Sequence, residues 1–241
     1  MKQIKRAPGV VVAALGLLAV ALRGLMYLLA EDDRGLLRSH PLVWLLWALT
    51  ACAALAAFRI SGMDTGDGKR NIPVAAAHWI FALGLLLPAR VDSAQVLPTL
   101  RMLEPVLRFG AAMALAAAGF SRLQGREPHF GCFGLLCVYL ILRSVFFYGI
   151  WCHDPQLMDY VFALLGNISL TLFAYQSAAL SAGLGKDRSR RFFGLFGCFC
   201  CLAAAPRSGC IPFYLSAAVW MTASVLWEKP EKKEQTHGNS R

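Results

Sequence analysis

The chain has 241 residues, of which 57% are hydrophobic and only 16% charged, and its formal net charge is +10. Its mean hydropathy is +0.53. Soluble domains carry about 25% charged and about 45–50% apolar residues, and one soluble core of this length cannot bury such an apolar excess. The composition excludes a disordered chain, a coiled coil and a disulfide-rich miniprotein. It predicts an all-α, polytopic bundle of membrane-spanning helices.

Eight apolar segments approach the roughly 20 residues that a helix needs to cross the hydrocarbon core. The predicted spans are Gly9–Leu29, Pro41–Ile60, Pro73–Arg90, Leu100–Phe120, Gly131–Trp151, Leu157–Leu180, Phe192–Pro206 and Ile211–Trp227. The seventh is short, and its end is the least well defined. We expect residues 1–227 to form one membrane-embedded bundle, with the polar residues 228–241 as a disordered cytoplasmic tail. The first span is too long for a signal peptide and contains Arg23, so a retained signal-anchor is expected.

Lysine and arginine in short loops predict the orientation of the bundle. With the N-terminus inside, sixteen of these residues fall on the inner side, five on the outer side, and three within spans. Both termini are therefore expected in the cytoplasm, and the positive charge is expected to meet anionic lipid headgroups. The expected location is a plasma membrane, and the general look is that of small bacterial multi-pass proteins.

The two halves of the bundle, residues 1–120 and 131–227, resemble each other weakly at an offset of about 117–120 residues. Arg23 aligns with Arg143, and Lys69 aligns with Lys186. Two parallel four-helix repeats would explain this, and transporters often place their site between such repeats. The alternative is that apolar helices with basic inner loops resemble one another by composition alone.

Three arginines, Arg23, Arg108 and Arg143, fall within predicted spans and in the outer half of the membrane. Ionisable groups at this depth are costly and usually functional. Guanidinium suits the recognition of carboxylate or phosphate groups, so these arginines are candidates for binding an anion in an outward-facing polar vestibule. Alternatively, they snorkel to the headgroups or lock the bundle through ion pairs. Glu104 lies four residues before Arg108, a spacing at which the two pair on a helix.

Small residues and amides give two further expectations. Asn167 and Gln176 on the sixth span are candidates to line the same cavity, or else to form ordinary interhelical hydrogen bonds.

The small residues from Gly110 to Gly119 let helices approach closely, so we expect the fourth span to be a central packing helix.

Cysteine and histidine patterns predict neither a metal site nor a catalytic site. Cys152 and Cys210 both fall at the predicted outer surface and could form a disulfide if that surface is oxidising. The cysteines between Cys198 and Cys201 point to different faces of a helix, which does not suit a closed zinc site. No HExxH and no GxSxG motif occurs. We therefore expect no metal, no cofactor and no catalytic residue, and an enzyme is disfavoured.

The leading functional hypothesis is a small-solute transporter or membrane binding protein whose ligand is a small anion. The alternative is a non-transporting scaffold or sensor subunit whose basic segment Lys186–Arg191 and tail dock a membrane or cytoplasmic protein. A lipid-active enzyme is a third possibility. The expected partners are these and the lipid bilayer. Nucleic acid is not an expected partner, because no basic helix lies outside the membrane. The transporter hypothesis predicts that Arg23 and Arg143 face one cavity, and the scaffold hypothesis predicts that acids pair with both.

Overall fold

The computed structural model describes residues 7–30, 41–62, 72–87, 98–151, 157–207 and 210–227. All eight predicted spans are helices, so the all-α fold class is confirmed. Their bounds are α1 Ala7–Ala30, α2 Pro41–Ile60, α3 Ile72–Leu86, α4 Pro98–Leu123, α5 Phe130–Trp151, α6 Leu157–Ser181, α7 Asp187–Ala204 and α8 Ile211–Trp227, with a short 3₁₀ turn η1 at Ala205–Arg207.

Five of these helices are long and apolar enough to cross a membrane, by length and composition: α1, α2, α4, α5 and α6. Helices α3 and α8 are apolar but shorter, with 15 and 17 residues. Helix α7 begins five residues before the predicted span, because its first turn is charged and an apolar run does not reveal it. The chain is therefore a helical membrane protein in its composition and architecture.

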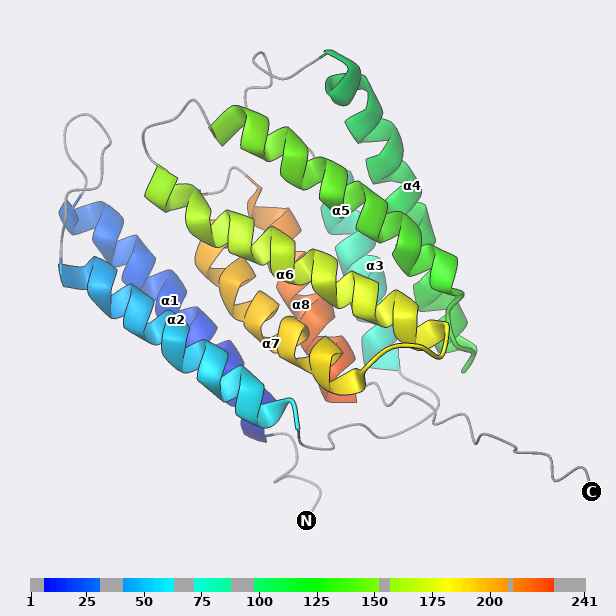
Figure 1. The fold of residues 1–241 in the computed structure, drawn as a ribbon, viewed down its shortest axis with the longest axis horizontal. Coiled ribbons are helices and arrows are strands. Elements are labelled where there is room, and N and C mark those ends of the chain that lie inside the picture. Colours follow the sequence, from blue (N-terminus) through cyan, green and yellow to red (C-terminus); the bar gives the residue numbers. More distant parts are fainter. Residues whose placement is uncertain are drawn as a thin grey trace, which may run out of the picture.

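The helices alternate in direction along the chain, so α1 begins and α8 ends at the same end of the bundle (Figure 1). We call this the terminal end and the opposite one the distal end. Helices α3 to α8 pack in chain order, and α8 returns to contact α3, which closes a six-helix body. Helices α1 and α2 form a hairpin that packs mainly on α7, at the side of this body.

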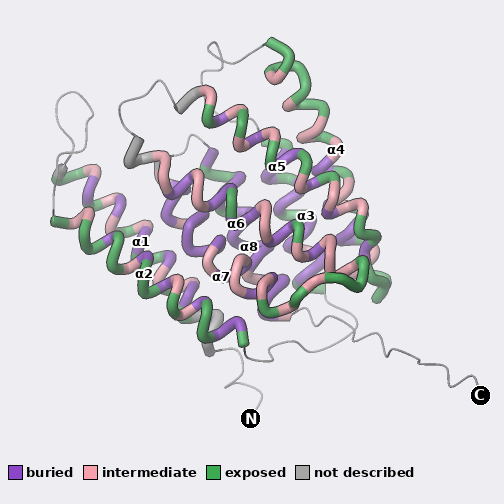
Figure 2. The backbone as a smooth tube through the Cα atoms, in the orientation of Figure 1, coloured by how far each residue is buried: buried purple, intermediate pink, exposed green. Residues whose placement is uncertain are grey.

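The most buried helices are α7 and α8, which lie in the middle of the molecule (Figure 2). The expectation that the fourth span is the central packing helix is wrong. Helix α4 buries one stripe, from Ala111 to Gly119, against its neighbours, while Phe109, Met113 and Phe120 remain more than half exposed. Its small residues do allow a close approach, since a Cβ at Gly119 would lie 2.8 Å from Trp79 Nε1. That approach is to α3 at the edge of the bundle.

Two glycines explain how α7 fits between α6 and α8. A Cβ added to Gly194 would lie 2.6 Å from Val225 Cγ2 on α8 and 2.9 Å from Phe173 Cε2 on α6. A Cβ added to Gly197 would lie 2.8 Å from Met221 Sδ. Small residues at such crossings let helix backbones approach closely, which is how helices in a lipid environment gain packing contacts.

Aromatic rings fill the centre of the six-helix body. The Trp220 ring stacks on Phe81 with centroids 5.1 Å apart, and it meets Phe173 edge-on at 4.9 Å. Phe133 and His78 complete the cluster, at 6.3 and 5.6 Å from the same ring. These contacts join α3, α5, α6 and α8 at mid-depth.

The predicted duplication stays a prediction, but the two halves pack differently. Helix α6 packs along α7, whereas α2, its counterpart in the first half, packs on α1 and α7 within the described residues. Helix α3 packs on α8 as well as on α4. The pairs α1–α2 and α3–α4 therefore have counterparts in α5–α6 and α7–α8, whereas the extensive contact between α6 and α7 is not repeated between α2 and α3 in the described residues.

Enlarging Gly194 should destabilise the protein. We expect Gly194→Leu to lower the free energy of unfolding by about 1–3 kcal/mol, because Val225 and Phe173 leave no room for a side chain. The matched control is Gly134→Leu on α5, since a Cβ there meets no atom within 4 Å. Thermal unfolding in detergent measures both. Equal midpoints for the two variants would contradict the close packing of α7.

Candidate functional site

Arg143 is buried in the distal half of the six-helix body. Its side chain is only 3% exposed, although guanidinium is permanently charged. Its Cζ lies 3.8 Å from the centre of the Phe213 ring and 4.3 Å from that of Phe147. Nη1 donates to the Tyr139 hydroxyl at 3.5 Å, while Nε and Nη2 have no hydrogen-bond partner. No carboxylate of the described residues pairs with this charge.

A short polar relay links Arg143 to α4. The Tyr139 hydroxyl donates to Glu104 Oε1 at 3.3 Å. Glu104 Oε2 lies 3.9 Å from Arg108 Nε, which is the pair that their four-residue spacing predicts. One carboxylate therefore pairs with Arg108 and reaches Arg143 only through the Tyr139 hydroxyl, so the summed charge of the three ionised groups remains positive.

The first turn of α8 completes the positive surroundings. Helix α8 begins at Ile211 beside Arg143, with Pro212 in its first turn. Proline is common there because it lacks an N–H that would have no partner within the helix. The N-terminus of a helix carries about half a positive charge. Tyr214 and Cys210 also lie close enough to interact electrostatically with the guanidinium.

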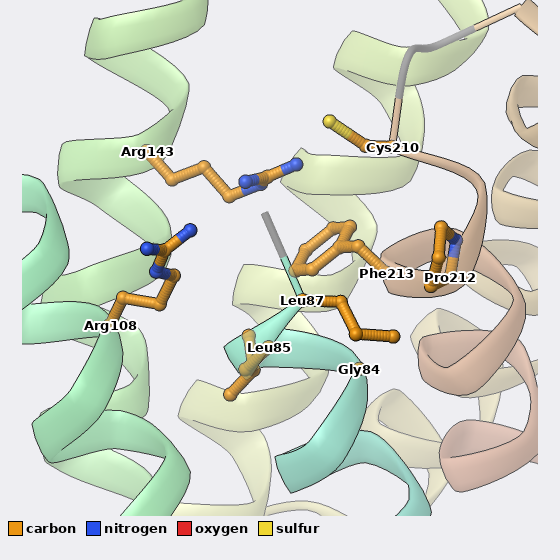
Figure 3. Close-up of a pocket in the computed structure, with 8 residues that line it drawn as sticks. All are labelled: Gly84, Leu85, Leu87, Arg108, Arg143, Cys210, Pro212 and Phe213. Atoms are coloured by element: carbon orange, nitrogen blue, oxygen red, sulfur yellow. The ribbon is translucent and has the colours of Figure 1, made fainter. Parts of the chain in front are cut away.

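A small pocket of about 10 Å³ lies between these groups (Figure 3). This volume is about the least that holds one water molecule. Arg143 reaches from α5 toward the start of α8, and Arg108 stands beside it on α4. The pocket is lined by Gly84, Leu85, Leu87, Arg108, Arg143, Cys210, Pro212 and Phe213. Two cations, a helix N-terminus and apolar walls suit a small anion that has shed most of its water.

Arg23 is also buried, but it lies in a different place, between the α1–α2 hairpin and α7. Its Nη1 donates to the Ala203 carbonyl at 2.9 Å, and Nη2 donates to the Tyr27 hydroxyl. Its Cζ lies 5.4 Å from the centre of the Phe162 ring. It is absent from the lining of the pocket beside Arg143. Arg23 and Arg143 therefore do not line the same pocket, contrary to what the transporter hypothesis predicts, and Arg23 instead contacts the last turn of α7.

The two predicted amides are separated as well. Gln176 lies near the terminal end, where its Oε1 accepts from the Lys186 backbone N–H at 3.4 Å and so holds the turn between α6 and α7. Asn167 is fully buried on α6, and neither its Oδ1 nor its Nδ2 has a hydrogen-bond partner. Of the five predicted ligand-binding residues, the structure brings Arg108 and Arg143 together, sets Asn167 deeper, and places Arg23 and Gln176 elsewhere.

Sequence reasoning missed Tyr139 and Phe213, which orient the Arg143 guanidinium. Tyr139 lies four residues before Arg143 on the same helix face, a spacing that could have revealed it. Phe213 comes from a helix that is 70 residues away in the chain, and no sequence signal links the two. The predicted partner of Cys210, Cys152, lies outside the described residues, so their disulfide stays a prediction.

The charged first turn of α7 is the other polar cluster. Asp187 Oδ1 lies 3.1 Å from Arg190 Nη2, and Asp187 Oδ2 pairs with Arg191. Both arginines are at least 95% buried, so they support the packing of α7 at the terminal end. Within the described ranges, no three His, Cys, Asp or Glu side chains come together to hold a metal ion.

Comparisons with known proteins do not add a relationship. No family model, no curated protein and no solved structure matches the chain.

The two buried arginines should differ in their effect on stability. We expect Arg23→Met to lower the free energy of unfolding by about 1.5–3 kcal/mol, because it removes charged hydrogen bonds to Ala203 and Tyr27. Arg143→Met should leave stability unchanged or raise it, because it removes a charge whose Nε and Nη2 have no partner. Thermal unfolding in detergent compares them. A loss at Arg143 as large as that at Arg23 would identify Arg143 as a structural lock instead.

Proposed function

We propose that this protein binds a small anion within the membrane, at a site formed by Arg143, Arg108 and the first turn of α8, and that it serves as a transporter or binding protein for that anion. The observation that carries the proposal is the guanidinium of Arg143, which is buried and keeps two nitrogens without a hydrogen-bond partner beside a pocket. Burying an uncompensated charge costs several kcal/mol. A bound anion would compensate it.

The surroundings favour a small, monovalent anion. The pocket has room for about one water molecule, so a large ligand requires Leu87 and Phe213 to move. Glu104 reduces the positive charge that the two arginines supply. Cation–π contacts with Phe147 and Phe213 hold the guanidinium plane in place, so its side chain loses little conformational entropy when the ligand binds.

The proposed orientation places the site on the outer side of a plasma membrane. It follows from the excess of Lys and Arg in the segments at the terminal end, which would lie in the cytoplasm. The distal end, where Arg143 lies, would then face outward.

The scaffold hypothesis has weaker support. Its docking segment Lys186–Arg191 contains Arg190 and Arg191, which are buried against Asp187 and are not available to a partner. Arg188 is exposed but lies 4.9 Å from the centre of the Phe58 ring on α2. Much of the predicted docking charge therefore acts within the chain itself.

Small anions should stabilise the purified protein. In detergent at constant ionic strength with gluconate as the bulk anion, we expect chloride, nitrate, formate or phosphate to raise the thermal midpoint. A ligand at 100 times its dissociation constant adds about 2.7 kcal/mol to the stability of the folded state. Differential scanning fluorimetry measures the shift for each salt.

Three variants make this test specific. Arg143→Gln should abolish the shift, and Arg143→Lys should weaken it, because lysine keeps the charge without the planar fork of donors. Arg23→Gln, the matched buried arginine outside the pocket, should lower the midpoint but keep the shift. An unchanged shift in Arg143→Gln, or no shift with any anion, would overturn the proposed function.

The orientation has its own test. With green fluorescent protein fused after Arg241 in a bacterial host, we expect fluorescence, because the fused domain folds in the cytoplasm. With alkaline phosphatase fused at the same position, we expect no activity, since that enzyme requires the outer compartment. The reverse pair of results would place the Arg143 site on the cytoplasmic side.

A further inference from the structure

Besides Arg143, the buried side chains of Asn167, Trp220 and Ser224 on α6 and α8 have polar atoms without a hydrogen-bond partner. These atoms are Asn167 Oδ1 and Nδ2, Trp220 Nε1 and Ser224 Oγ. None of the three is more than 1% exposed. A buried polar group left without a partner is costly, and native proteins retain few of them without a reason. Such groups on α5, α6 and α8 therefore call for a shared explanation.

Contacts between α6 and α8 fix the depth of Asn167. These helices run in the same direction from the distal end (Figure 1). Near that end, the Tyr214 hydroxyl donates to the Ala163 carbonyl at 3.4 Å, and at mid-depth Phe173 meets Trp220. Asn167 lies between Ala163 and Phe173 on α6. It is therefore deeper than Tyr214 and shallower than the Trp220 cluster.

The contact between α5 and α6 gives the depth of Asn167 relative to Arg143. Cys137 Sγ donates to the Thr171 carbonyl at 3.7 Å, and the two helices are antiparallel. Arg143 is six residues after Cys137, which places it about 9 Å closer to the distal end along α5. Asn167 is four residues before Thr171, which places it about 6 Å closer to the distal end along α6. Asn167 thus lies just below the backbone of Arg143.

Ser224 extends the series toward the terminal end. It lies four residues after Trp220 on α8, which places both side chains on the same helix face. From the distal end, the order of the unpartnered groups is Arg143, Asn167, Trp220 and Ser224. We call these four residues the donor series.

The chemistry of the donor series favours anions. Guanidinium and indole nitrogens donate hydrogen bonds and cannot accept them, and the amide and the hydroxyl can also donate. None of the four residues is acidic. An ion that leaves water must have its hydration replaced by groups of the opposite polarity. Four successive donors replace the hydration of an anion, whereas a cation would need acceptors.

We propose that the donor series is the permeation path of a small anion between the Arg143 site and the terminal end, with Asn167 and Ser224 as positioning residues below the binding site. This inference rests on the proposed function and extends it from binding to passage. In this structure the path is closed at mid-depth, where Trp220 packs between Phe81 and Phe173. Passage therefore requires the Trp220 ring to move aside.

An anion-driven swelling assay tests the path. Vesicles that contain the full-length protein are placed in isotonic potassium chloride or potassium nitrate with valinomycin, which makes potassium freely permeant. Light scattering then reports the entry of the anion. We expect vesicles with wild-type protein to swell faster than protein-free vesicles by at least about tenfold, as a path lined by donors lowers the barrier for dehydration.

Removal of single donors should slow this entry. Asn167→Leu and Trp220→Phe should each reduce the protein-dependent rate by roughly tenfold or more, because each removes one donor to a charged ligand. Ser224→Ala should reduce it in the same direction. The matched control is Ser177→Ala, a buried serine on α6 whose hydroxyl donates to the Phe173 carbonyl and is not in the series. It should keep the wild-type rate.

Stability and binding separate this inference from the proposed function. Asn167→Leu should unfold at the wild-type temperature or higher, since it removes an amide without partners, and it should keep the anion-induced midpoint shift at Arg143. If Asn167 were only structural, its midpoint would fall and entry would persist. Entry at the wild-type rate in Asn167→Leu, or no entry in wild type while the shift persists, would overturn the path and leave the binding site standing. Loss of both the shift and the entry in wild type would overturn both.

Discussion

Close backbone contacts hold α8 in the centre of the molecule, and the rest of the structure depends on them. Gly84 on α3 leaves room for Ser216, because a Cβ there would lie 1.9 Å from the serine Oγ. Gly194 on α7 leaves room for Val225 on the other side. With α8 fixed from two sides, its first turn reaches Arg143 and its middle carries Trp220 into the aromatic cluster. The pocket and the donor series both follow from this placement.

The free-energy cost of burying the charge of Arg143 is the main reason to propose a function for this site. An arginine at bilayer depth costs about 2.5–3.5 kcal/mol on insertion scales, and Arg23 offsets such a cost with hydrogen bonds to Ala203 and Tyr27. Arg143 instead contacts two aromatic faces and donates a long hydrogen bond to Tyr139, while its Nε and Nη2 have no hydrogen-bond partner. Two arginines that align in the sequence therefore differ in how their charge is satisfied.

Helix positions could be predicted from the sequence, because apolar runs of membrane length are a local property. The predicted spans Pro41–Ile60 and Ile211–Trp227 agree with α2 and α8 at both ends. The packing partners of each helix could not be predicted, because they depend on which helix face carries small residues at the points of contact. The fourth span is rich in alanine and was expected at the centre, yet α7 takes that place through Gly194 and Gly197. For the same reason, sequence could nominate Arg143 but could not foresee Phe213 beside it.

The arrangement of the α1–α2 hairpin has a consequence for biosynthesis. The hairpin packs mainly on α7, whose first residue Asp187 follows the last hairpin residue Ile60 by 127 positions. At synthesis rates of about 5–20 residues per second, the hairpin waits on the order of ten seconds for its partner. During that interval Arg23 has no Ala203 carbonyl to bind, and its long side chain must reach the headgroups for hydration. The first helix thus enters the membrane with a charge that only the nearly finished chain can accommodate.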